Sequence, residues 1–150
     1  MNKDQGMTLI VKTITRYTVW LILVYGIYII LHGHLTPGGG FAGGVIIALA
    51  FLNVMLAYGR TFTEEWLHIK TLHSLEALSA LLFLILGIGG IVFAGGFLAN
   101  FISHGKLFRL VSSGTIPVLN IFIGIKVAAG LFVVIWTLAL FHIGHKGGAE

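Results

Sequence analysis

Four long apolar runs dominate the chain, and short polar segments separate them. The runs cover about residues 13–31, 40–58, 72–97 and 116–141. Each is close to or longer than the roughly 20 apolar residues that an α-helix needs to cross a bilayer. Because the runs are continuously apolar, without alternating polar positions, they disfavour a transmembrane β-barrel. We therefore predict an all-α integral membrane protein in which residues 1–150 form one domain of four transmembrane helices.

The polar segment between the second and third runs has a helical pattern of its own. It reads GRTFTEEWLHIK over residues 59–70, with Phe62 and Trp66 one helical turn apart. Thr61 and Glu64 have the spacing of a capping box, in which two side chains close the start of a helix. We expect a short amphipathic helix that lies on the cytoplasmic membrane surface and leads into the third run.

Composition supports the membrane assignment and narrows the chemistry. The chain is 57% hydrophobic and 9% charged, and its mean hydropathy is +1.02. A soluble domain carries about 25% charged residues, so this chain has too few to cover a surface in water. It has no cysteine, which excludes disulfides, cysteine-ligated iron–sulfur clusters and thiolate metal sites. We see no catalytic nucleophile with a base and no phosphate loop. We therefore expect no enzyme active site, cofactor, metal or nucleic-acid partner in this chain.

The positive charges are unequally divided between the two ends of the four runs. With four spans, both termini and residues 59–70 share one side of the membrane. That side holds Lys3, Lys12, Arg16, Arg60, Lys70 and Lys146. The other side holds Lys106 and Arg109. Loops rich in lysine and arginine stay in the cytoplasm, so we predict a multi-pass protein of the cell (plasma) membrane with both termini cytoplasmic.

The connection between the first two runs is rich in glycine. It reads HGHLTPGGGFAGGV over residues 32–45. Pro37 disfavours helix at Thr36, so we predict Thr36 as the N-cap and Pro37 as the first residue of the second helix. Gly38 and the two glycines after it give a backbone that is free to take positive φ. A tight turn followed by a packing face of small residues explains much of this segment, although an ordinary turn needs only one glycine or proline.

Small residues also recur at helical spacing on the second and fourth runs. Such spacing lets two membrane helices approach closely. The residues in these predicted packing faces are Gly39, Gly40, Gly43, Gly44, Asn120 and Gly124. We expect these faces, together with the glycines of the third run, to pack against other subunits.

Lys126 is the residue with the most unusual position. It lies about 15 Å from the outer end of the fourth run by helix rise, where a charge costs at least about 2.5–3.5 kcal/mol on insertion scales. Two interpretations stay open: a proton relay, or a structural pair with a carboxylate of a neighbouring chain. Glu76 is the one acidic residue in any run. We expect it to lie about 15 Å away from Lys126 in depth, which places the partners of both on other subunits.

Two histidines, His32 and His34, flank Gly33 at the predicted outer end of the first run. Imidazole titrates near physiological pH and can pass protons, so His34 joins Lys126 and Glu76 as an ion-pathway candidate. The simpler interpretation is that His34 donates a hydrogen bond that stabilises the turn. A zinc site needs further ligands, and the segment around the histidines offers neither carboxylate nor cysteine.

Three motifs resemble those of a known family. They are HGHLTPGGGFAGGV, SLEAL in the third run, and SSGTIPVLNIFIGIKVAAG at the start of the fourth. Over nearly its whole length the chain resembles the MrpB (MnhB) subunits of the Mrp (Mnh) multisubunit sodium/proton antiporters. The resemblance implies a small component of a hetero-oligomeric membrane complex that exchanges Na⁺ for H⁺, with other Mrp-type subunits as partners. Its own part in transport would be packing and lining an ion path.

Two other functions stay open at this point. Similar subunits occur in archaeal membrane-bound hydrogenases and sulfane sulfur reductases, where the resemblance would place the chain in a redox-driven ion pump. A different class of function is a small autonomous channel or carrier built as a homo-oligomer. Purification distinguishes the two kinds of assembly, since a complex subunit copurifies with other membrane proteins and a homo-oligomer does not need them.

Overall fold

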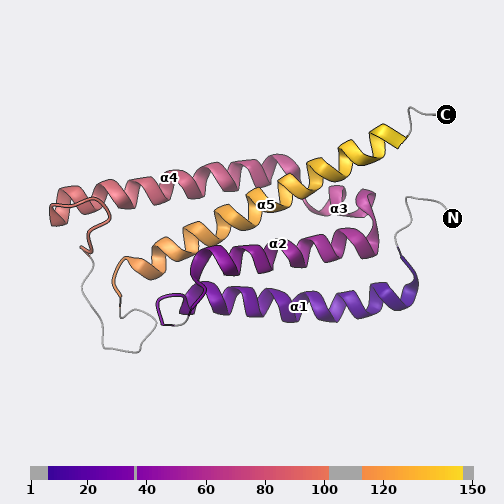
Figure 1. Ribbon diagram of the computed structural model, residues 1–150, viewed down its shortest axis with the longest axis horizontal. Coiled ribbons are helices and arrows are strands. Elements are labelled where there is room, and N and C mark those ends of the chain that lie inside the picture. The colour runs from indigo at the N-terminus through magenta and orange to yellow at the C-terminus, as the bar shows by residue number, and fades with distance from the viewer. Residues whose placement is uncertain (1–6, 36, 102–112, 147–150) are drawn as a thin grey trace.

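The computed structural model describes residues 7–35, 37–101 and 113–146, the last six of them by their backbone alone. The described part is helical (Figure 1), and four of its helices are long and apolar enough to cross a membrane. The elements are α1 (Leu9–His32), α2 (Gly39–Tyr58), α3 (Arg60–Trp66), α4 (Ile69–Ala94) and α5 (Ile116–Lys146). The predicted all-α fold with four spans and a short helix between the second and third is therefore confirmed.

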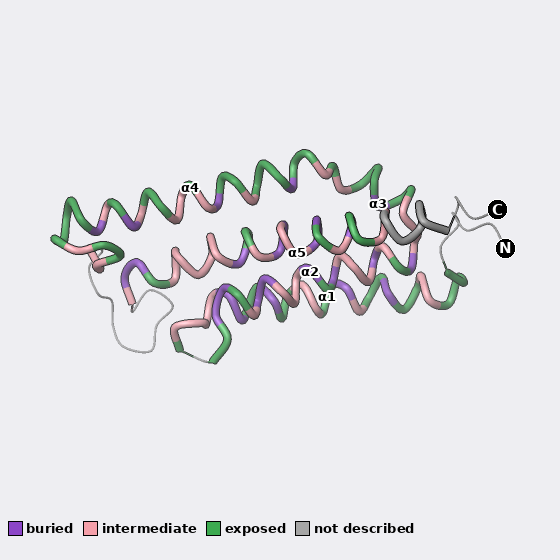
Figure 2. The backbone as a smooth tube through the Cα atoms, turned by 45° about the horizontal axis from the view of Figure 1, so that its top comes forward, coloured by how far each residue is buried: buried purple, intermediate pink, exposed green. Residues whose placement is uncertain are grey.

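The four long helices lie side by side in the order α1, α2, α5, α4 (Figure 1). α2 and α5 occupy the middle, with α1 packed against α2 and α4 packed against α5. The short helix α3 lies at the same end of the bundle as the start of α1 and the later part of α5 (Figure 1). This arrangement gives α1 and α4 one covered side each and leaves much of their surface open (Figure 2).

Two apolar clusters hold the helices together. The larger joins α4 to α5 and contains Leu72, Phe132 and Trp136, with Phe51 of α2 packed against it. Phe132 is 1% exposed and meets Phe51 edge to face, with ring centroids 6.0 Å apart. The smaller cluster joins α1 to α2 through Val19, Ala50 and Val54. Lipid tails are as apolar as leucine, so these contacts stabilise the bundle by close packing.

The helix ends differ from the predicted limits for local reasons. We expected the third span to end near Phe97, but α4 ends at Ala94 because Gly95 takes a left-handed conformation with φ +74°. Its N–H donates to the carbonyl of Ile91 at 3.1 Å, and the N–H of Gly96 donates to that of Gly90 at 3.3 Å. These bonds satisfy carbonyls that the helix end would otherwise leave open. The chain then folds back along its own helix.

Both predicted helix starts are wrong in detail. α2 begins at Gly39 after an N-cap at Gly38 with φ +142°, so Pro37 precedes the helix; Thr36 lies outside the described residues. α3 begins after Gly59, with φ +89° and no side-chain cap, and Thr61 lies inside the helix. Glycine at positive φ turns the chain into each helix without strain. Glu64 accepts instead from Arg60, with Nη2 to Oε1 3.0 Å, as an i,i+4 pair on the surface of α3.

Candidate functional site

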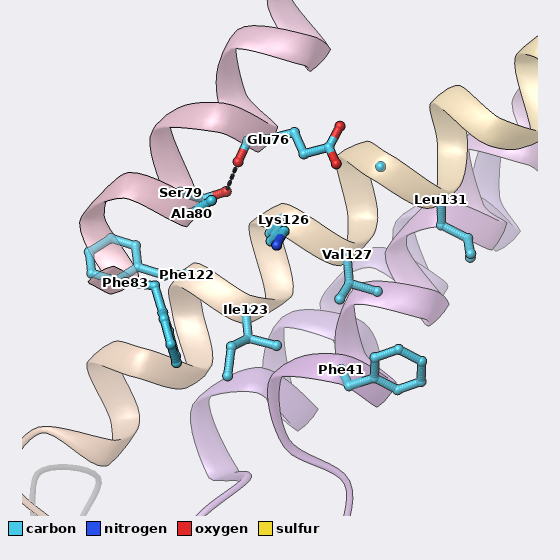
Figure 3. Close-up of a pocket in the computed structure, with 11 residues that line it drawn as sticks. Phe41, Glu76, Ser79, Ala80, Phe83, Phe122, Ile123, Lys126, Val127 and Leu131 are labelled. Carbon is cyan, nitrogen blue, oxygen red and sulfur yellow. Dashed lines mark hydrogen bonds between the residues drawn. The ribbon is translucent and has the colours of Figure 1, made fainter. Parts of the chain in front are cut away.

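A cavity of about 490 Å³ lies between α4 and α5, and both charged candidates, Glu76 and Lys126, line it (Figure 3). Most of its wall is apolar, and one residue of α2, Phe41, completes it. The lining residues are Phe41, Glu76, Ser79, Ala80, Phe83, Phe122, Ile123, Lys126, Val127, Gly130 and Leu131. A mostly apolar cavity with a few convergent polar groups is the usual form of a binding site.

Glu76 reaches across from α4 toward α5 (Figure 3). Its side chain is half-buried, and it lies against Gly130. A Cβ atom built on Gly130 would lie 3.1 Å from Oε1 of Glu76. The missing side chain of Gly130 therefore leaves the space that the carboxylate occupies. The hydroxyl of Ser79, which is 3% exposed, donates to the main-chain carbonyl of Glu76 at 2.9 Å.

Lys126 lies one helical turn from Gly130 on the same helix, so Glu76 and Lys126 differ in depth by about 6 Å. The expected offset of about 15 Å was wrong. That value assumed that both helices end at the same level of the membrane. α5 instead extends past the start of α4 and crosses it obliquely (Figure 1). The structure therefore brings the two opposite charges to one cavity without joining them in a direct ion pair.

The side chain of Lys126 is exposed in the isolated chain. It lies ten residues after Ile116, about 15 Å along α5 and thus about half-way through a hydrocarbon core of about 30 Å. Charged side chains at such depth face the interior of a bundle, a water-filled cavity or a partner. The chain supplies Glu76 on one side of Lys126 and leaves its other side open.

The predicted glycine packing faces meet helices of the same chain. A Cβ on Gly44 would lie 2.8 Å from Cβ of Val127 on α5, and one on Gly43 would lie 2.5 Å from Cγ1 of Ile30 on α1. Gly40 faces the backbone of α5 at Asn120, and Gly124 faces Ile30. We expected these faces to meet other subunits. They instead hold α1, α2 and α5 together, because the close approach of α2 to both neighbours needs small residues on both of its sides.

The glycines of α4 also have partners inside the chain. A Cβ on Gly87 would lie 2.7 Å from Cε2 of Phe97, and one on Gly90 would lie 2.7 Å from the backbone nitrogen of Ala99. The returning segment after α4 fills this face, and the N–H of Leu98 donates to the carbonyl of Gly87 at 3.2 Å. The glycines of α4 therefore pack against a later segment of the same chain and not against a separate subunit.

The glycine-rich turn packs against the start of α5. A Cβ on Gly33 would lie 2.9 Å from Nδ2 of Asn120, and one on Gly39 would lie 3.5 Å from its Oδ1. His34 is half-buried in this turn and is not among the residues that line the Glu76–Lys126 cavity. Nδ1 of His32 lies 3.1 Å from the carbonyl oxygen of Tyr28. The turn and the cavity are thus separate features.

Sequence reasoning missed the part that Gly130 and Ser79 play beside Glu76. Gly130 stands one turn after Lys126 on the same helix, which was the available signal. The described residues contain no group of three or more histidine, cysteine or acidic side chains that is arranged to hold a metal ion.

Comparison with known families decides the assignment. Residues 10–133 match the model of a domain related to the MnhB subunit of Na⁺/H⁺ antiporters. The chain belongs to this MnhB family. The membership confirms the resemblance drawn from the PGGGF and GTIP motifs, and together with the four spans it makes the chain a multi-pass membrane protein of an antiporter-subunit family.

Relatives of this MnhB chain come from bacteria and archaea. The B-type component of the Na⁺/H⁺ antiporter of Bacillus subtilis is 32% identical over 107 residues, which are 71% of this chain and 74% of that protein. An uncharacterized protein of Methanocaldococcus jannaschii is 44% identical over 117 residues, 74% of this chain. The chain spans only 44% of the length of that archaeal protein.

A solved structure has the same fold. A chain of the membrane-bound sulfane sulfur reductase, an archaeal respiratory membrane complex, superposes with a TM-score of 0.73 at 32% identity. The match covers 90% of this MnhB chain and 61% of the reductase chain. The family therefore has members in a named antiporter and a structural relative in a respiratory complex.

Proposed function

We propose that this chain is the MnhB component of a multisubunit, Mrp-type antiporter that exchanges Na⁺ for H⁺ across the cell membrane. The proposal is supported by the family match over residues 10–133 and by the antiporter component of Bacillus subtilis, of which the chain covers 74%. In this proposal the chain is one domain, its partners are other Mrp-type membrane subunits, and it is not itself an enzyme.

A role in transport is supported by the cavity that Glu76 and Lys126 share. Its two charges lie at neighbouring depths in a mostly apolar wall, and Lys126 is exposed toward the outside of the bundle. A neighbouring subunit that covers this cavity would exclude lipid and leave a polar passage between the chains. Lys126 and Glu76 would then stabilise a passing proton or cation in turn, since intramembrane ionisable residues are typical of ion pathways.

His34 has a separate place in this proposal. It lies in the turn between α1 and α2, at the end of the bundle opposite α3 (Figure 1). With both termini in the cytoplasm, that end faces outward, where an imidazole can exchange protons with the solvent. We assign His34 to the outer mouth and not to the cavity, because it does not line the cavity.

A second candidate function rests on the reductase structure, which matches 90% of this chain. In that case the chain would be the equivalent subunit of a redox-driven ion pump, and the redox chemistry would belong to other chains. The same cavity would serve the ion-translocating part of such a complex. An autonomous homo-oligomeric carrier is a third candidate, and the test below also addresses it.

The test begins with a tag on this chain in its native membrane. We expect other membrane subunits to copurify in fixed proportion. The purified complex is then reconstituted into vesicles, and Na⁺-dependent dissipation of a pH gradient is measured with and without a reductant and acceptor. Exchange without redox substrates supports the antiporter, and exchange that requires them supports the redox pump. A homo-oligomer that transports alone would overturn both.

A further inference from the structure

A second groove, of about 430 Å³, lies between α1, α2 and α3. Half of its lining residues are aromatic, among them Trp20, Tyr58, Phe62 and Trp66. The rings of Tyr58 and Phe62 are stacked, with centroids 4.9 Å apart. Trp20 and Trp66 are 66% and 62% exposed, so the groove opens sideways from the bundle toward its surroundings.

The groove has a positive end. Arg16 of α1 lines it and is exposed, and no acidic residue is among the described residues of its wall. Within residues 7–35, 37–101 and 113–140 the Arg16 side chain makes no hydrogen bond or ion pair. Lys12 lies one turn earlier on α1, with Nζ 5.9 Å from the centre of the Tyr58 ring. Two cations therefore converge where α1 passes Tyr58. Arg60 is engaged elsewhere, by Glu64 and the ring of Trp136.

The groove runs inward from near the boundary between headgroups and hydrocarbon. Arg16 lies seven residues after Leu9, about 10 Å from the start of α1. α1 has 24 residues, so it is about 36 Å long and exceeds a hydrocarbon core of about 30 Å by about 6 Å. The backbone of Arg16 therefore lies about 4–7 Å inside the edge of the core, and its long side chain extends toward the headgroups. Tryptophan and tyrosine are enriched at this level of a membrane, where their rings meet both lipid tails and polar headgroups.

We propose that this groove binds one anionic phospholipid, with its phosphate at Arg16 and an acyl chain along the aromatic wall. A guanidinium binds phosphate through paired, charge-assisted hydrogen bonds, and Arg16 lines the groove. A volume of about 430 Å³ lies within the range of about 300–1,000 Å³ for ligand sites. The proposal does not depend on whether the complex is an antiporter or a redox pump.

The test uses the intact complex in nanodiscs of phosphatidylcholine. A trace of phosphatidylglycerol with a photoreactive group in its acyl chain is added, and crosslinked residues are located by mass spectrometry. We expect labelling along Trp20–Leu23 and at Phe62. Arg16→Gln lowers this labelling about tenfold, the effect of losing one charge-assisted hydrogen bond. The matched control Lys70→Gln removes an exposed positive charge at the same end of the bundle, outside the groove, and leaves labelling unchanged.

Two results would overturn the proposal. Equal labelling by a photoreactive phosphatidylcholine, unchanged in Arg16→Gln, would mean that the groove holds bulk lipid without headgroup recognition. A photocrosslinker at Phe62 that captures another subunit, with no lipid labelling, would mean that protein covers the groove. Copurification of the Arg16→Gln complex with all its subunits excludes misfolding as the cause of lost labelling. Arg16→Lys keeps the positive charge, so we expect it to retain part of the labelling.

Discussion

Replacing Lys126 by alanine tests whether its charge is coupled to Glu76. The lysine lies about half-way through the membrane, where a charge costs at least about 2.5–3.5 kcal/mol on insertion scales. Glu76 lies opposite Gly130, one turn away. The two residues differ by about 6 Å in depth along α5, so at an effective dielectric of about 20 the attraction between their charges is at most about 3 kcal/mol. This limit is similar to the insertion cost, so we predict that Glu76 offsets part of the cost of Lys126.

Alanine at position 126 removes that compensation and leaves the carboxylate of Glu76 half-buried in an apolar cavity. We expect loss of ion exchange and a lower melting temperature of the purified complex. Lys126→Ala combined with Glu76→Gln removes both charges, so stability returns toward the wild type while exchange stays low. The measurements are a thermal unfolding series over the two single variants and the double variant, and Na⁺/H⁺ exchange in reconstituted vesicles. The coupling energy is the deviation from additivity.

Lys126→Arg separates a relay from a fixed charge. Arginine keeps the positive charge but does not release a proton near neutral pH. We expect the arginine complex to assemble with normal stability and to exchange ions slowly. Additive effects of the Lys126 and Glu76 variants on stability would refute the coupling. Wild-type exchange by Lys126→Ala would refute any part for this lysine in transport.

Three further predictions follow from the helix contacts and the charge distribution. Gly44→Leu places bulk 2.8 Å from Cβ of Val127, so the chain itself loses stability by about 1–3 kcal/mol or more, measured as increased protease sensitivity before assembly. Cysteine at exposed Met7 stays unreactive toward an impermeant thiol reagent in intact cells while cysteine at Leu35 reacts, and the reverse pattern contradicts cytoplasmic termini. Asn100→Ala removes the acceptor 3.1 Å from the backbone N–H of buried Thr115, which costs about 1–3 kcal/mol in thermal unfolding.

The number and order of the helices could be predicted from hydropathy because a membrane span needs a minimum apolar length. The helix ends could not, since they depend on the backbone conformation of single glycines. Gly38, Gly59 and Gly95 all take positive φ where a helix starts or stops. Gly39 and Gly114 also take positive φ, and the sequence does not distinguish these five positions from the other glycines. Pro37 and Thr61 are the usual start signals, and in both cases a preceding or following glycine sets the boundary instead.

The two charged residues of the candidate site could be predicted from the sequence, but their proximity could not. Depth arguments single out Lys126 and Glu76 one at a time, because each is a charge in an apolar run. Their proximity depends on the tilt of α5 across α4, and counting residues along each helix does not reveal that tilt. The space for the Glu76 carboxylate depends on Gly130, and only the structure shows that Gly130 lies opposite Glu76.

Small-residue faces likewise indicate close approach but not the identity of the approaching helix. Gly43 and Gly44 contact α1 and α5 respectively, and Gly90 contacts the chain that returns after α4. These small residues are thus already used inside the chain. It follows that surfaces for neighbouring subunits lie on bulkier, exposed positions, and the side of α5 that carries Lys126 is the strongest of these because its charge requires cover. Loss of assembly on placing tryptophan at exposed Ile125, beside Lys126, with none at exposed Leu21 of α1, would support this division of surfaces.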